Sequence, residues 1–223
     1  MMDPVVPIRK RLMLAFLVHT PAALLMLAGY VVSKKKQIPL WMLTRDPADI
    51  SQVSPFVGAI SNIGILLWCA AATICFFTFL ISMKQMCNPL QKFFLLASAI
   101  LTTILMIDDF FLVHEWIFPV YFNLDQKYVL FFYLAITCIY FLIFKNVIIE
   151  SDFFFIMLSI IFFSLSLIID IIVDNYSEFS QIIVDYHLFE DGFKLFGITS
   201  WLTYFTLYSL KSVTKKPSEE RLL

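Results

Sequence analysis

Long apolar runs separated by short polar connections make up most of the chain. Each run has about the 20 residues that a helix needs to cross a bilayer. We therefore predict an all-α integral membrane protein, folded as a bundle of about six transmembrane helices in a single domain. The predicted spans lie near residues 12–33, 57–83, 93–118, 128–148, 153–174 and 191–211.

The polar connections complete this outline. Residues 37–56 form the longest hydrophilic loop, and the half-polar residues 175–190 suit a short interfacial helix before the last span. Residues 212–223 are expected to be a short cytoplasmic tail. The first apolar run exceeds the roughly 7–15 residues of a signal-peptide core. Three lysines rather than a cleavage site follow it, so we interpret it as an uncleaved span.

Composition supports the membrane class. Hydrophobic residues make up 61% of the chain and charged residues only 15%, against about 25% charged residues in soluble domains. No basic stripe predicts a nucleic-acid partner, so the expected partner is the lipid bilayer. The four cysteines lack a CxxC spacing, which favours a packing role.

Lysine and arginine placement predicts the orientation. With six spans, ten of these residues fall on one side and five on the other. The larger group predicts that both termini are cytoplasmic, although Lys34, Lys35 and Lys36 oppose it. We predict a location in the inner (plasma) membrane of a bacterium.

Ionisable side chains cluster at the ends of three predicted spans. They lie in segments 108–115, 170–174 and 185–194. An ionisable group at membrane depth costs several kcal/mol unless it is paired, hydrated or metal-bound. Six alternating spans would bring the three segments to one membrane face, so the sequence predicts a polar site there.

Helical phase predicts which groups meet. Asp108 and Glu115 are seven residues apart and would share one helix face, whereas Asp109 points about 100° away. A second set has spacings of three, four and seven residues, and its members are His187, Glu190, Asp191 and Lys194. The only cation among these carboxylates is Lys194, which would neutralise one of them.

These residue types suggest metal-assisted chemistry. A metal would be held by Asp108, Glu115, Asp170, His187 and Asp191. Oxygen ligands suit calcium or magnesium, and added histidines suit zinc. Asp109 or Glu190 would act as general base, and Lys194 would stabilise developing negative charge. These residues also have simpler explanations than metal binding. They could be hydrated at the membrane surface, and Asp191 and Lys194 could form a helix-capping pair.

Two short segments resemble known membrane enzymes. The pair Asp108-Asp109 late in a span resembles the acidic patch of alkaline-ceramidase-type hydrolases, which bind zinc through three histidines. Here His187 is followed four residues later by Asp191 rather than by histidine, and Ala97 stands at the upstream ligand position. Residues 190–194 are similar to the EExxK element of CAAX-type membrane proteases, but the later histidine motifs are missing. The chain is assigned to neither family.

Three functions therefore stay open at the level of sequence. The first is a metal-dependent membrane hydrolase that acts on a lipid-like substrate. The second is a cation or proton transporter or channel with an acidic mouth, in which Asp108 or Asp170 carries the proton. The third is a structural or regulatory subunit whose charged patch docks another protein.

Overall fold

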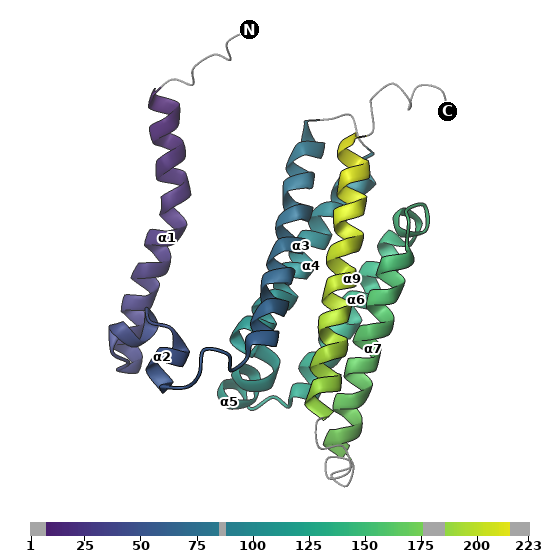
Figure 1. The fold of residues 1–223 in the computed structure, drawn as a ribbon. Coiled ribbons are helices and arrows are strands. Elements are labelled where there is room, and N and C mark those ends of the chain that lie inside the picture. Colours follow the sequence, from purple (N-terminus) through teal and green to yellow (C-terminus); the bar gives the residue numbers. More distant parts are fainter. Residues whose placement is uncertain (1–7, 85–87, 176–185, 215–223) are drawn as a thin grey trace. The chain divides into compact units, whose positions relative to one another are not determined.

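The structure is a computed structural model that describes residues 8–84, 88–175 and 186–214. The chain divides into two compact units, Met1–Val57 and Gly58–Leu223, and each is described by itself (Figure 1). All regular elements in the described residues are helical. The predicted all-α class is therefore confirmed.

The first unit contains one long helix and two short ones. These are α1 (Ile8–Lys36), the 3-10 helix η1 (Leu40–Leu43) and α2 (Pro47–Ser51). The α2 helix begins where the side chain of Asp46 accepts a hydrogen bond from the Ala48 backbone N–H at 2.8 Å. Pro47 at the first helical position has no N–H to satisfy, which favours this start.

The second unit is a helical bundle. Its elements are α3 (Ala59–Met83), α4 (Pro89–Phe111), the π-helical turn η2 (Val113–Ile117), α5 (Phe118–Phe122), α6 (Gln126–Ile149), α7 (Phe154–Asn175) and α9 (Tyr186–Thr214). Successive long helices alternate in direction, so the end of α4, the start of α6, the end of α7 and the start of α9 lie at one end of the bundle (Figure 1). We call it the acidic end.

Local chemistry fixes where the helices begin. Asn88 caps α4 by accepting from the Leu90 N–H, and Pro89 follows it. Asp125 caps α6 by accepting from the Lys127 N–H at 2.9 Å. Such side-chain caps satisfy N–H groups that have no partner in the first helical turn.

Aromatic packing fills the core of the second unit. Trp68 on α3 stacks on Phe163 of α7, with ring centroids 5.6 Å apart, and meets Trp201 of α9 edge-on at 5.9 Å. A Cβ atom at Gly197 would lie 2.7 Å from the Phe163 ring. The glycine therefore allows α7 and α9 to approach closely, as helix packing with small residues does in membranes.

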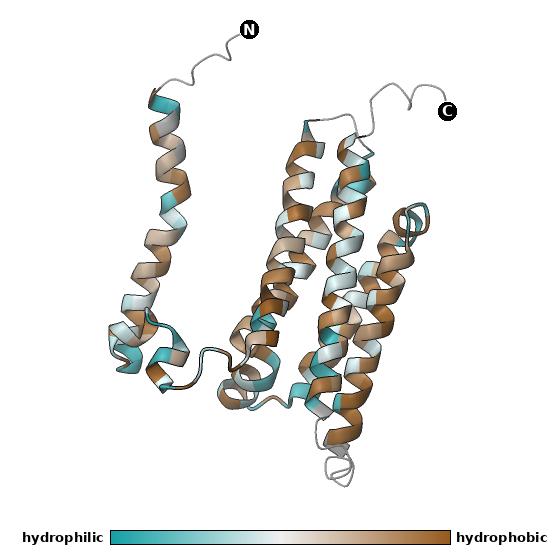
Figure 2. Cartoon of the chain, viewed as in Figure 1, coloured by the Kyte–Doolittle hydropathy of each residue, from teal (hydrophilic) through white to brown (hydrophobic). Residues whose placement is uncertain are grey.

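In the part of the chain that the structure describes, five helices are long and apolar enough to cross a membrane, namely α1, α3, α4, α6 and α7. Figure 2 shows apolar residues along most of α7, whereas α9 carries many residues of intermediate hydropathy. Serine, threonine and tyrosine dilute the apolar residues of α9, so the predicted sixth span is long enough but is not among the five. Most of the half-polar segment 175–190 lies outside the described residues.

Candidate functional site

The acidic end brings together side chains from several helices. Most of them come from the last turn of α4, from η2, from α6 and from the first turns of α9, and α3 and α7 each contribute one more. The eight residues predicted for the site lie in or beside three small groups, which we name after His114, Lys194 and Glu190.

A break in α4 sets up the first group. Leu112 has a left-handed conformation (φ +52°), which ends α4 and starts the π-helical turn η2. A non-glycine residue in this conformation costs roughly 1–2 kcal/mol. The side chain of Asp108 offsets this cost by accepting the His114 backbone N–H at 3.0 Å. π-Helical turns within helices occur frequently at functional sites.

The His114 group consists of Asp108, His114 and Tyr133. Asp108 is buried, with 4% of its surface exposed. Its carboxylate also accepts a short hydrogen bond from His114 Nδ1 and one of 3.0 Å from the Tyr133 hydroxyl on α6. Because Asp108 holds Nδ1, the other ring nitrogen, Nε2, is directed to Glu115 at 3.6 Å.

This environment tunes the protonation of His114. Burial by itself lowers the pKa, but the hydrogen bond and negative charge of Asp108, helped by Glu115, raise it more. Lys194 opposes the rise, and the net result is a pKa above the ordinary value of 6.5. His114 is therefore a proton-binding group whose charged form Asp108 stabilises.

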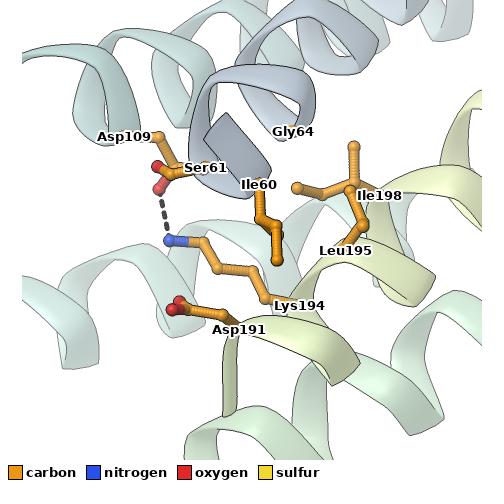
Figure 3. Close-up of a pocket in the computed structure, with 8 residues that line it drawn as sticks. All are labelled: Ile60, Ser61, Gly64, Asp109, Asp191, Lys194, Leu195 and Ile198. Atoms are coloured by element: carbon orange, nitrogen blue, oxygen red, sulfur yellow. Dashed lines mark ion pairs between the residues drawn. The ribbon is translucent and has the colours of Figure 1, made fainter. Parts of the chain in front are cut away.

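The Lys194 group consists of Asp109, Lys194 and Trp68. The Lys194 ammonium on α9 donates to the Asp109 carboxylate at 2.7 Å. The indole N–H of Trp68 on α3 donates to the same carboxylate at 2.9 Å. Figure 3 shows the ammonium directed to Asp109, with the Asp191 carboxylate on the other side of the lysine. The group joins α3, α4 and α9.

A small pocket opens beside this ion pair. Its lining comprises Ile60, Ser61, Gly64, Asp109, Asp191, Lys194, Leu195 and Ile198 (Figure 3). The cavity volume is about 20 Å³, which is enough for about one water molecule. Asp109 and Asp191 together carry one more charge than Lys194 balances, so the pocket suits water or a small cation.

The Glu190 group lies in the first turns of α9. Glu190 is 3.6 Å from His187 one turn away, and the charge of Asp170 on α7 also acts on it. His187 is largely exposed, with 71% of its side chain in contact with solvent. These residues form a surface cluster in which the predicted general base Glu190 faces another carboxylate.

The predicted ligands do not gather in one place. Among the described residues, no three histidine, cysteine, aspartate or glutamate side chains lie close enough together to hold a metal ion. The expected shared face of Asp108 and Glu115 is wrong, because the chain turns at Leu112 before the second helical turn is complete. The third long helix correspondingly ends at Phe111 rather than near residue 118.

Three members of the site, His114, Trp68 and Tyr133, were not among the predicted site residues. Trp68 and Tyr133 donate directly to the paired aspartates, yet aromatic residues in apolar runs usually indicate packing. Their polar atoms could have indicated a role in the site, because buried tryptophan N–H and tyrosine O–H groups usually form a hydrogen bond.

Comparison with known proteins places the chain in a family without assigning an activity. No curated protein and no solved structure matches it. One family model matches residues 14–208, which covers most of the chain. The chain therefore belongs to the family described as a domain of unknown function, DUF8692.

Proposed function

We propose that the chain is a multi-pass membrane protein that binds and transfers protons at its acidic end, as a transporter or channel. In this proposal α9 is the sixth span, since its 29 residues would reach about 43 Å at 1.5 Å per residue. Both termini would then lie on the cytoplasmic side, as the lysine and arginine placement predicts.

The observation that carries the proposal is the Asp108–His114 pair. A buried carboxylate holds one ring nitrogen and leaves Nε2 for exchange with water and Glu115. An intramembrane carboxylate paired with a titratable group is typical of proton relays. Tyr133 adds a hydroxyl to the same carboxylate, so Asp108 keeps a partner when His114 loses its proton.

The geometry favours proton transfer over metal-dependent hydrolysis. A catalytic zinc site needs three protein ligands, and the described residues offer no such group. The pocket beside Lys194 has room for water and not for a lipid headgroup. Docking of a partner protein stays a prediction, for which no particular surface provides support.

Proton flux through liposomes tests the proposal. The purified chain is reconstituted with a pH-sensitive dye inside, and a potassium gradient with valinomycin drives proton entry. We expect Asp108→Asn and His114→Gln to reduce flux by at least about tenfold, equivalent to about 1.4 kcal/mol in the barrier. Glu150→Gln is the matched control, because this exposed carboxylate lies at the opposite end of α6. Flux equal to that of empty liposomes, or unchanged flux in Asp108→Asn, would contradict the proposal.

A further inference from the structure

A second set of polar groups lies deep in the bundle, away from the acidic end. The Ser98 hydroxyl on α4 and the Tyr140 hydroxyl on α6 are hydrogen-bonded at 2.7 Å, and both residues are buried. The Tyr204 hydroxyl on α9 bonds to Ser151 at 2.9 Å. Ser151 follows α6 and precedes α7, at the bundle end opposite the acidic end (Figure 1).

These two pairs are close to each other. Phe94 packs against the Tyr140 ring at 6.0 Å and against Phe205 at 5.9 Å, and Phe205 packs against the Tyr204 ring at 5.0 Å. The hydroxyls of Ser98, Tyr140, Tyr204 and Ser151 therefore form one cluster, which we call the hydroxyl cluster. It extends from the middle of α4 to the far end of the bundle.

Packing alone does not require these hydroxyls. The chain has 25 phenylalanines and nine tyrosines, and phenylalanines surround the cluster. The Tyr140 ring packs against Phe94 and Phe144, and the Tyr204 ring against Phe205. A hydroxyl both donates and accepts, so a proton can pass within each hydrogen-bonded pair, Ser98–Tyr140 and Tyr204–Ser151. A water molecule would have to join the two pairs.

Two tryptophans bond to α4 residues between the acidic end and Ser98 of the hydroxyl cluster. Trp68 donates to Asp109, and Trp201 donates to Thr102, one helical turn from Ser98 on α4. Indole N–H groups donate and do not accept, so a proton cannot hop through either ring. Passage between the two regions needs a tryptophan to move or a water molecule to enter.

We infer that the hydroxyl cluster is the far-side half of a proton route that begins at Asp108, and that Trp68 and Trp201 close the route between its halves. The inference rests on the proposed function, because it gives the proton released at the acidic end a path to the opposite face. Tyr140 and Tyr204 are its two relay residues.

The test measures proton flux together with the titration of His114 at the acidic end. Tyr140→Phe, Tyr204→Phe and the double variant are reconstituted for the same liposome assay, with the amount of folded protein measured by gel filtration. We expect flux to fall by at least about tenfold in the double variant. Tyr128→Phe is the matched control, because this tyrosine lies exposed on α6 near the acidic end. Histidine-specific nitrogen NMR should show an unchanged His114 titration in the double variant.

The outcomes separate this inference from the proposed function. If the double variant conducts like the wild type while Asp108→Asn does not, the route is wrong and the proposed function stands. If flux falls only in proportion to the folded fraction, the hydroxyls stabilise the bundle and the route is also wrong. Ser98→Ala provides a second variant, which removes the hydroxyl bonded to Tyr140 and should also reduce flux. Absence of flux in the wild type would overturn both proposals.

Discussion

Asp108 and Asp109 are neighbours in sequence, yet they have different partners. Asp108 faces α6 and η2 and pairs with a histidine, whose charge depends on pH. Asp109 faces α3 and α9 and pairs with a lysine, which stays charged under ordinary conditions. The difference arises because consecutive residues on a helix point about 100° apart. One helix end can thus supply both a titrating group and a fixed ion pair.

The largest expected effect comes from breaking the Lys194 group. Lys194→Met leaves Asp109 without a cation inside the bundle, and loss of one partner of a buried charge pair costs roughly 2–5 kcal/mol. We expect the lower part of that range, because 36% of the lysine side chain is exposed. Thermal unfolding in detergent measures the loss.

A double variant isolates this ion pair. Adding Asp109→Asn to Lys194→Met should recover part of the stability, because no unpaired carboxylate remains. If the stability losses of the two single variants simply add up in the double variant, the two charges do not interact. Such additivity would remove the contrast between the two aspartates.

The second effect concerns the His114 group. Asp108→Asn removes the charge that His114 and Tyr133 share but keeps the shape of the side chain. We expect a loss of about 1–3 kcal/mol, the range for a buried polar partner left unsatisfied. A loss as large as that of Lys194→Met would indicate that the two groups are equivalent. Lys127→Gln, an exposed change at the start of α6, is the control.

The pH dependence of stability should distinguish the two groups further. Folding raises the pKa of His114, so protonation favours the folded state. The contribution of His114 protonation to the free energy of unfolding is complete below its ordinary pKa of 6.5. It is lost as pH rises through the higher pKa of the folded state. Unfolding temperatures measured across this window should fall with pH in the wild type and much less in His114→Gln. An equal fall in both proteins would assign the effect to another group.

The smallest effect is expected for Glu115. Its carboxylate lies 3.6 Å from His114 Nε2, and 48% of its side chain is exposed. Glu115→Gln should cost less than about 1 kcal/mol, as exposed ion pairs do. The histidine NMR titration should move to lower pH, because one raising charge is removed. A larger shift than that of Asp108→Asn would place the main partner of His114 at Glu115.

Hydropathy was sufficient to predict much of the fold. The apolar runs predict helices close to the observed α1, α3, α6 and α7 because each long apolar segment satisfies its backbone groups internally in a membrane. The predicted count of about six spans depends on α9. Several polar residues of this helix face neighbouring parts of the bundle. Trp201 and Tyr204, for example, are buried, with their polar atoms bonded to Thr102 on α4 and to Ser151 between α6 and α7. A window average counts such residues as polar without regard to their partners.

The sequence by itself determined which ionisable residues would be costly, and hence that Asp108, Asp109, His114 and Lys194 need partners. Only the tertiary structure decided the pairing. The left-handed turn at Leu112 brings His114 back onto Asp108, and the packing of α9 beside α3 brings Lys194 to Asp109. Helical phase cannot foresee either contact, because one depends on a single backbone torsion and the other on how separate helices rotate against each other. The sequence thus shows which charges are costly to bury, whereas packing determines which partner each charge has and therefore whether it titrates.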